Sequence, residues 1–156
     1  MRRCPDLSLY LVLDPGLCAG VGMVETARAA VAGGATVVQL RDKTADTARM
    51  IETGRALKAA LAGTGAALIV NDDVEAAIAI GADGLHIGQG DMAVAEARER
   101  IGAAMVLGLS VETPALSAAV DPALVDYIGA GPVFATPSKR DHKAPCLLYT
   151  SDAADD

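Results

Sequence analysis

The sequence is poor in aromatic residues: it has no tryptophan, one phenylalanine and three tyrosines, and aromatics make up 3% of the chain. Apolar residues nevertheless account for 52% of the 156 positions, so a hydrophobic core has to consist of alanine, valine, isoleucine and leucine. Side chains of this size suit small-residue helices packed on a sheet. The length is sufficient for one domain with a sizeable core and gives no reason to expect two.

Basic residues are also scarce, with 13 Lys and Arg against 20 Asp and Glu and a net charge of -7. Nucleic-acid phosphates and membrane surfaces are held mainly by clustered Lys and Arg, so the composition argues against both as partners. A few basic residues in one pocket would still bind a small anion. A run of about 18 apolar residues, which a transmembrane helix needs, is missing.

Cysteines are few and scattered, with neither metal-ligand nor disulfide spacing, at Cys4, Cys18 and Cys146. The apolar run at residues 7–13 is interrupted by two polar residues, and no small-residue cleavage site follows it closely. A buried strand explains this run better than a signal peptide does. Both observations favour a reducing cytoplasm as the location.

Six short runs rich in Val, Ile and Leu recur, at residues 9–14, 36–40, 67–71, 84–88, 105–110 and 127–133. They are continuously apolar rather than alternating, which is typical of parallel strands covered on both faces. Helical periodicity lies between them. One stripe consists of Ala48, Ile51, Gly54, Leu57 and Leu61, and a second helix at 94–101 spaces Glu96 and Arg100 for an ion pair on its exposed side.

Similar turns enter several of the runs, at residues 33–38, 81–87 and 124–130. Helix followed by strand, repeated in this way, gives right-handed βαβ units, which suit a doubly wound sheet or a barrel. Residues 13–20 lack the glycine motif that a Rossmann unit carries after its first strand, and polar residues follow nearly every run. We therefore predict an α/β fold, a (β/α)₈ TIM barrel that is incomplete, with about six of eight strands.

The segment after Pro145 shows no pattern of helix, strand or turn, and it resembles a translated sequencing adapter joined to a truncated reading frame. We interpret residues 1–145 as a partial barrel domain and residues 146–156 as a non-native tail. On this interpretation strands seven and eight are missing. The open edge of the sixth strand would invite aggregation or pairing with another copy, as in a homo-oligomer.

Long polar side chains follow the second run, in the segment "QLRDK" at residues 39–43. Side chains two apart on a strand share a face, so Gln39, Arg41 and, if extension continues, Lys43 should project together over the barrel mouth. An amide, a guanidinium and an ammonium suit a phosphorylated ligand with a hydrogen-bonding ring. Considered alone, the segment is explained equally well as a solvated loop.

Carboxylates follow the third and fourth runs: Asn71 and Asp72 end the third, and Asp91 comes three residues after the fourth. Neighbouring strands lie about 4.8 Å apart, so a short loop can bring both carboxylates to one cation. Few oxygen ligands, with room left for water and phosphate, favour Mg²⁺ over zinc. Alternatively, Asp72 or Asp73 only caps the next helix, and both hold if Asp73 caps while Asp72 binds metal.

The fifth run ends on the hydroxyl of Ser110, and the loop after the sixth carries Thr136, Ser138 and Lys139. Two hydroxyls and an ammonium can contact a phosphate, but an ordinary proline-containing turn has the same composition. His86 lies within the fourth run. A lone strand histidine is more often packed and hydrogen-bonded than catalytic, and alternation permits this one to face inward.

Four segments in register, "VVQLRDK", "LIVNDDVEAAIAIGADGLHIGQGDM", "GLSVET" and "DYIGAGPVFATPSK", closely resemble the thiamine-phosphate synthase family. The similarity runs in order from Leu9 to Lys139. It implies a (β/α)₈ barrel transferase that joins hydroxymethylpyrimidine diphosphate to a thiazole phosphate, with Mg²⁺, and gives thiamine monophosphate and diphosphate. Both partners are small molecules.

The resemblance also implies roles for individual residues. Asp72 and Asp91 would hold Mg²⁺ against the pyrimidine diphosphate, and Gln39 would contact the pyrimidine. Asn71 would bind the diphosphate together with four residues that would also be catalytic: Arg41, Lys43, Ser110 and Lys139. The thiazole phosphate would be bound by Thr136 and Ser138, the latter a position at which the family usually has threonine.

The implied chemistry needs no covalent nucleophile, which agrees with a sequence that has no Ser-His or Cys-His motif. Diphosphate leaves the methylene of an electron-rich aminopyrimidine, its charge is neutralised by Mg²⁺ and basic side chains, and the thiazole nitrogen attacks the methylene carbon. The family's other phosphate contacts follow the seventh and eighth strands, which this sequence lacks. We therefore expect the 156-residue chain to be inactive or unstable, although it derives from an active enzyme.

Two other functions are compatible with parts of the sequence. A thiazole tautomerase is a related barrel without a diphosphate substrate, and it has no use for "QLRDK" and "ND" together. A non-catalytic phosphate-binding barrel fragment is the second. Mg²⁺-dependent binding of pyrimidine diphosphate would separate both from the synthase.

Overall fold

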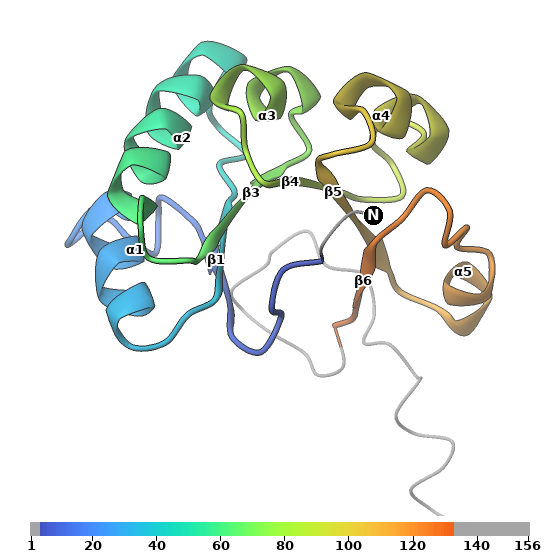
Figure 1. Ribbon diagram of the computed structural model, residues 1–156, viewed down its shortest axis with the longest axis horizontal. Helices are drawn as coiled ribbons and strands as arrows, with labels where there is room; N and C mark the ends of the chain where they lie inside the picture. The colour runs from blue at the N-terminus through green and yellow to red at the C-terminus, as the bar shows by residue number, and fades with distance from the viewer. Residues whose placement is uncertain (1–3, 133–156) are drawn as a thin grey trace, which may run out of the picture.

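The structure is a computed structural model that describes residues 4–132, and within them strands and helices alternate throughout (Figure 1). The strands are β1 (Tyr10–Leu13), β2 (Val37–Leu40), β3 (Ala67–Asn71), β4 (Gly84–Ile87), β5 (Val106–Val111) and β6 (Tyr127–Ala130). The helices are α1 (Met23–Ala32), α2 (Thr47–Leu61), α3 (Val74–Ile80), α4 (Val94–Ile101) and α5 (Pro114–Ala118). The six predicted strands and both helices predicted from periodicity are confirmed.

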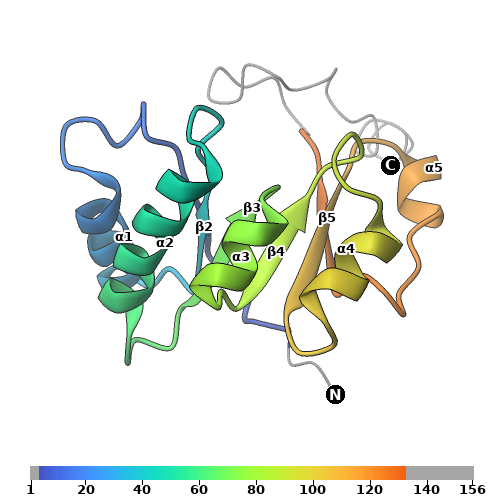
Figure 2. The ribbon, with the colours of Figure 1, turned by 90° about the horizontal axis from the view of Figure 1, so that it is seen from above.

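The strands form one parallel sheet in the order β1-β2-β3-β4-β5-β6. A doubly wound sheet would reverse its strand order at a switch point, whereas this order never reverses. The sheet curls, and the helices cover its convex side (Figure 1). All carboxyl ends of the strands lie at one edge, at the top of Figure 2. The described strands thus form the curled part of a β/α barrel, as predicted.

Alternation along the strands separates the core from the concave face. On β2, Val38 and Leu40 are fully buried in the core under the helices, whereas Gln39 points to the concave side and is 4% exposed. His86 on β4 likewise faces inward, between Leu85 and Ile87, which both belong to the core. The convex side therefore carries the apolar packing and the concave side carries polar side chains.

Helix α2 begins after Asp46, whose side chain accepts a hydrogen bond from the Arg49 N–H at 2.8 Å, a common N-cap. Its buried stripe is Met50, Gly54, Leu57 and Leu61. The predicted stripe was therefore wrong at its start, because the first turn leaves Ala48 exposed and Met50 occupies the inner position. Gly54 is essential to this packing: a β-carbon there would lie 2.9 Å from Ile80 Cγ1 of α3.

Helix α4 uses its charged residues differently from the prediction. Arg100 pairs with Glu75 of α3 at 3.2 Å rather than with Glu96 on its own helix, because α3 and α4 lie side by side. Arg98 is buried, which the pattern of residue types did not indicate. Its guanidinium donates to the carbonyls of Leu124, Gly102 and Met105 and pairs with Asp126 at 2.6 Å.

The amino-terminal edge of the sheet is held by three equivalent contacts at the turns into β2, β4 and β6. The Asp83 N–H donates to the Leu68 carbonyl at 2.9 Å, and its carboxylate accepts from the Leu68 N–H at 2.8 Å. Asp126 brackets Leu107 in the same way, with both distances 2.8 Å. Thr36 makes the equivalent contacts with Leu9: its hydroxyl accepts from the Leu9 N–H, and its own N–H and hydroxyl lie within hydrogen-bonding distance of the Leu9 carbonyl. The similar turns noticed in the sequence therefore fasten each even-numbered strand to the preceding odd-numbered one.

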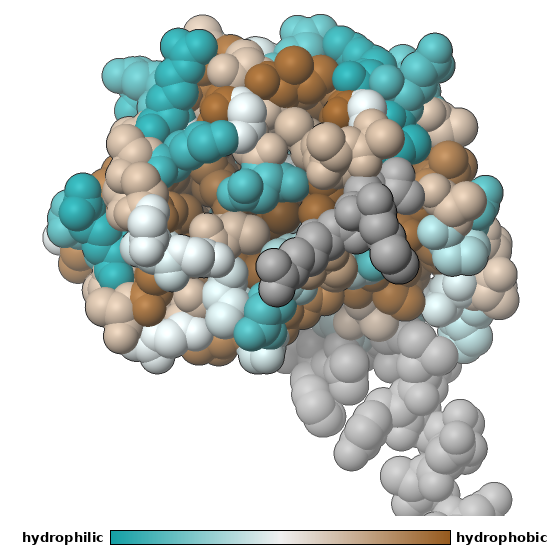
Figure 3. All heavy atoms as spheres, viewed as in Figure 1, coloured by the Kyte–Doolittle hydropathy of each residue, from teal (hydrophilic) through white to brown (hydrophobic). Residues whose placement is uncertain are grey.

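Polar residues gather around the rim of the molecule over the helices, whereas much of the centre of the view is apolar (Figure 3). Within residues 4–132, no helix has the length and apolar character needed to cross a membrane.

Candidate active site at the carboxyl edge of the sheet

Two adjoining cavities open at the carboxyl edge of the strands. The outer one has a volume of about 310 Å³ and contains most of the predicted polar residues; it is lined by Arg41, Lys43, Asn71, Asp72, Gly88, Gln89, Gly90, Asp91, Ser110 and Glu112. The inner one, about 410 Å³, lies against the concave face of the sheet. Three residues line both: Arg41, Asn71 and Ser110. Parallel barrels place their chemistry at this edge.

Asp72 follows β3 directly, and its backbone is in the left-handed region, with φ of 63°. Aspartate is one of the few residues that tolerate this conformation. The Asp72 N–H donates to the His86 carbonyl at 2.8 Å, which ties the residue to the end of β4. The next residue, Asp73, caps α3 by accepting from the Ala76 N–H at 2.8 Å. The predicted cap at Asp73 is confirmed, and it leaves the Asp72 side chain in the outer cavity.

Asp91 reaches the same cavity from the loop after β4. Its carboxylate accepts a hydrogen bond from the Gly88 N–H at 2.7 Å, so the turn holds it in place. A β-carbon at position 88 would lie 2.9 Å from that carboxylate oxygen, so glycine lets the carboxylate approach the backbone without displacement. Gln89, in the same turn, donates to the Ser110 carbonyl at 2.7 Å and thereby joins the loop to β5.

The basic residues approach from β2 and the loop after it. Arg41 is half-buried and lies 3.4 Å from Asp14, which follows β1. Lys43 contacts the Asp72 carboxylate. The condition set for Lys43, that the extended strand continues to it, is not met, because β2 ends at Leu40 and Lys43 reaches the cavity from a bend in the following loop. Both side chains nevertheless arrive where they were predicted to be.

The Asp72 carboxylate in the outer cavity carries an electrostatic penalty in its charged form. Burial raises the pKa of Asp72 above its ordinary value; Lys43 lowers it again, and the nearby Asp91 carboxylate raises it. Two carboxylates that repel one another in this way are stabilised by a cation between them. Lys43 supplies part of that charge.

These residues fit a magnesium ion. The carboxylates of Asp72 and Asp91 are hard oxygen donors that face one cavity, with the Asn71 amide beside them. Among residues 4–132, no three His, Cys, Asp or Glu side chains come together as a metal site. A cation held by two carboxylates would complete its coordination with water or phosphate, as Mg²⁺ commonly does.

The inner cavity contains a row of hydrogen bonds that the sequence did not reveal. Gln39 Nε2 donates to the Tyr10 hydroxyl at 2.8 Å, and that hydroxyl lies 2.8 Å from the Tyr127 hydroxyl. The Tyr127 hydroxyl is 3.0 Å from His86 Nδ1, and His86 Nε2 is 2.9 Å from Ser110 Oγ. Burial raises the pKa of both tyrosines, which therefore stay protonated. Sequence spacing could not link residues on five different strands.

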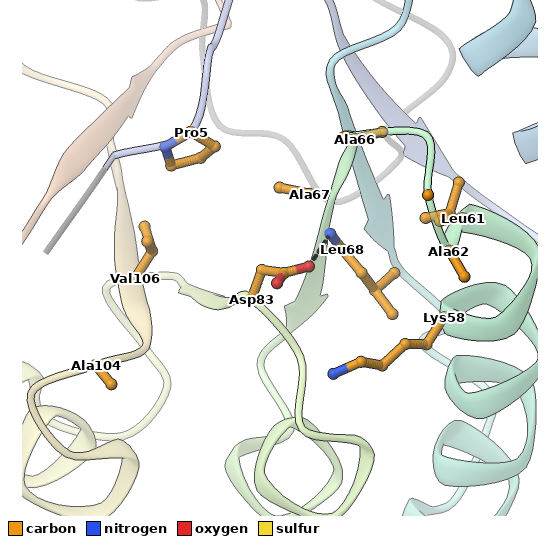
Figure 4. Close-up of a pocket in the computed structure, with 12 residues that line it drawn as sticks. Pro5, Lys58, Leu61, Ala62, Ala66, Ala67, Leu68, Asp83, Ala104 and Val106 are labelled. Atoms are coloured by element: carbon orange, nitrogen blue, oxygen red, sulfur yellow. Dashed lines mark hydrogen bonds between the residues drawn. The ribbon is translucent and has the colours of Figure 1, made fainter.

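A larger cavity of about 590 Å³ lies at the opposite, amino-terminal edge (Figure 4). Its walls are mostly small apolar residues, and its two charged side chains are engaged. Asp83 accepts from the Leu68 N–H at 2.8 Å, and Lys58 contacts the Gly81 carbonyl. Both contacts are made to the backbone and are explained by a structural role. The candidate site is therefore the one at the carboxyl edge, although the cavities there are smaller.

A family model described as thiamine monophosphate synthase matches residues 9–154 of the chain. The chain belongs to this family. The resemblance inferred from four sequence segments is thereby confirmed. Thiamine-phosphate synthases from Xanthobacter autotrophicus and Laribacter hongkongensis are 54% and 48% identical to it, over 87% and 94% of the chain.

A solved member of the family has the same fold. Thiamine phosphate pyrophosphorylase from Pyrococcus furiosus superposes with a TM-score of 0.75 and 36% identity, over 83% of this chain. The chain covers 62% of that structure, and 64% and 69% of the Xanthobacter and Laribacter synthases.

Three of the predicted site residues, Thr136, Ser138 and Lys139, lie outside the described residues, as does the predicted boundary at residue 145. The other seven all line the two cavities: Gln39 the inner one, Lys43, Asp72 and Asp91 the outer one, and Arg41, Asn71 and Ser110 both.

Proposed function

We propose that the protein is a thiamine-phosphate synthase, a transferase that condenses hydroxymethylpyrimidine diphosphate with a thiazole phosphate to give thiamine monophosphate and diphosphate. One observation carries the proposal. Three carboxylates, those of Asp72, Asp91 and Glu112, and two basic side chains line one small cavity, which adjoins a second cavity lined by an amide and aromatic rings. A substrate with a diphosphate at one end and a hydrogen-bonding ring at the other matches this pair of compartments.

In this proposal the ring occupies the inner cavity and contacts the amide of Gln39. The diphosphate lies in the outer cavity against Arg41, Lys43, Asn71 and Ser110. Guanidinium and ammonium groups bind phosphate oxygens through charge-assisted hydrogen bonds, the strongest kind available to side chains. Asp72 and Asp91 hold Mg²⁺, which when bound supplies positive charge against the diphosphate.

Arg41 and Lys43 assist the reaction by binding the leaving group more strongly as its charge grows. The C–O bond between the pyrimidine methylene and the diphosphate breaks, and the electron pair leaves with the diphosphate. The thiazole nitrogen donates its electron pair to the methylene carbon. Lys43 has to turn from Asp72 toward the diphosphate, and its exposed position at the cavity mouth allows this movement.

The remaining predicted contacts complete the proposal. Lys139 also binds the diphosphate and acts with Arg41, Lys43 and Ser110 as a catalytic residue, and Thr136 and Ser138 bind the thiazole phosphate. The partners are these small molecules, without nucleic acid or membrane, and the location is the cytoplasm. A homo-oligomer is part of the same proposal.

Calorimetry with Mg²⁺ and hydroxymethylpyrimidine diphosphate tests the proposal. We expect binding that requires Mg²⁺ and that Asp72→Asn abolishes, since asparagine keeps the left-handed backbone but loses the charge. The matched control is Asp73→Asn, which removes the same charge one residue away and retains a helix cap. If Asp72→Asn binds as well as the parent chain, the metal assignment is wrong.

A further inference from the structure

The row of hydrogen bonds in the inner cavity has a direction that its first member fixes. The Gln39 amide nitrogen can only donate, so the Tyr10 oxygen accepts. The arrangement that keeps every proton within the row sends the single proton of Tyr10 to the Tyr127 oxygen and the single proton of Tyr127 to His86 Nδ1. With Nδ1 accepting, the neutral ring carries its proton on Nε2 and donates it to Ser110 Oγ. Reversing the link between the tyrosines would leave the Tyr10 proton without an acceptor in the row, and reversing the link to His86 would leave the Tyr127 proton without one.

Two glycines make the central link of this row possible. In the register of the sheet, Gly108 lies between His86 on β4 and Tyr127 on β6. A β-carbon at Gly108 would lie 2.5 Å from His86 Nδ1 and would also clash with the Tyr127 ring. A β-carbon at Gly129 would lie 3.2 Å from His86 Cε1. Glycine at these two positions thus leaves the space that the His86 ring occupies between its hydrogen-bond partners.

The end of the row faces the ligand. Ser110 Oγ accepts from His86, so the serine proton is directed to another acceptor, and Ser110 lines both cavities beside Arg41 and Asn71. A hydroxyl oriented in this way presents a proton, not a lone pair, to an anion. The same direction means that His86 does not accept the serine proton, so the pair is not arranged as a nucleophile and its base.

We propose that Tyr127 and His86 are positioning residues. Tyr127 holds His86 as its Nε2–H tautomer, and His86 thereby orients the Ser110 hydroxyl as a donor to an anionic ligand in the outer cavity. The identification of that anion as a diphosphate rests on the proposed function. The tautomer of the His86 ring is inferred from the hydrogen bonds alone and is independent of that function. The row also links Gln39, at the ring end of the proposed substrate, to Ser110, at its diphosphate end.

Nitrogen-15 NMR of the histidine rings tests the direction of the row without any ligand. The chain has two histidines, His86 and His142, and His142→Gln assigns the signals. We expect His86 to show a protonated Nε2 and an unprotonated Nδ1 at neutral pH. In Tyr127→Phe, which keeps the ring but removes the donor, we expect a signal from protonated Nδ1 to appear. A protonated Nδ1 in the parent chain, or an unchanged ring in Tyr127→Phe, overturns the inference.

Calorimetric titration with inorganic diphosphate and Mg²⁺ tests the consequence for the ligand. We expect His86→Leu to weaken binding about tenfold, the usual worth of one hydrogen bond to a charged group. His86→Gln, whose amide can donate in place of Nε2, should restore the affinity to within about threefold. Adding Ser110→Ala to His86→Leu should cost little further, because the hydroxyl that it removes is no longer oriented toward the anion once His86 is absent.

The outcomes separate this inference from the proposed function. Parent-like affinity in a folded His86→Leu chain, checked by circular dichroism, overturns the positioning role. If the parent chain binds no diphosphate, the proposed function fails for this chain, and the tautomer of His86 then decides the inference alone. Gly108→Ala provides a second way to break the row, by steric displacement of the Tyr127 ring, and should shift the His86 tautomer as Tyr127→Phe does.

Discussion

Two ion pairs at opposite edges of the same sheet differ in almost every respect. At the amino-terminal edge, the Arg98 and Asp126 side chains are 9% and 11% exposed, and further hydrogen bonds surround both. At the carboxyl edge, Lys43 and Asp72 are 49% and 24% exposed, and a second carboxylate repels the first. The first pair is satisfied as it stands, whereas the second includes a carboxylate whose charged form is penalised by burial and by Asp91. The buried ion pair and the proposed site thus lie at opposite ends of the strands.

The largest effect should come from breaking the amino-terminal pair. Arg98→Met removes the guanidinium that faces the buried Asp126 carboxylate, and the free energy of unfolding in urea should fall by about 3–5 kcal/mol. The control is Arg100→Ala on the same helix, whose pair with Glu75 is solvent-exposed and should be worth only about 0–1 kcal/mol. Equal losses in the two variants would contradict the contrast between buried and exposed pairs.

The packing of α2 on α3 gives the next largest effect. Alanine is normally favoured over glycine within a helix by about 0.5–1 kcal/mol. At Gly54 we expect the opposite sign, a loss of about 1–3 kcal/mol, because the added methyl would overlap Ile80. Combining Gly54→Ala with Ile80→Val should recover part of the loss. A double-mutant cycle from urea unfolding measures it, and simple additivity would show that the two residues do not compete for space.

At the carboxyl edge a substitution should stabilise the chain. Without Mg²⁺, Asp72→Asn removes a carboxylate whose pKa is raised by burial and by Asp91, and the free energy of unfolding should rise by up to about 1 kcal/mol. A raised carboxyl pKa means that the folded chain binds the proton more tightly than the unfolded chain. The penalty of the charged form is therefore present above that pKa and disappears as the pH falls toward the ordinary value near 3.9.

Thermal melts across pH, in chelator and in excess Mg²⁺, check this expectation. The advantage of Asp72→Asn should shrink at acid pH, and Mg²⁺ should stabilise the parent chain only. A variant that is less stable than the parent in chelator would show that the contact with Lys43 outweighs burial and repulsion.

The sequence was sufficient for the strands, the barrel-like order and the residues at the carboxyl edge, because continuous apolar runs and the polar residues that follow them are evident from residue types alone. It was insufficient wherever a partner comes from a distant element. Arg98 reads as one more charge on a helix, and only the packing of α4 against the turns before β5 and β6 explains its burial. The link from Gln39 to Ser110 requires the curl of the sheet, which brings Tyr10 and Tyr127 together across 117 residues.

The smallest effect on stability should come from replacing Lys43. This substitution gives the most direct comparison of the exposed pair with the buried pair at Arg98. Lys43→Gln breaks a half-exposed pair, so the free energy of unfolding should change by less than about 0.5 kcal/mol. Affinity for Mg²⁺ and diphosphate should nevertheless fall about tenfold, because one charge-assisted contact to the anion is lost. Urea unfolding and calorimetry on the same preparation give both quantities. Loss of stability without loss of affinity would place Lys43 in the same class as Arg98, a residue that serves the fold, and the division between the two edges would not hold.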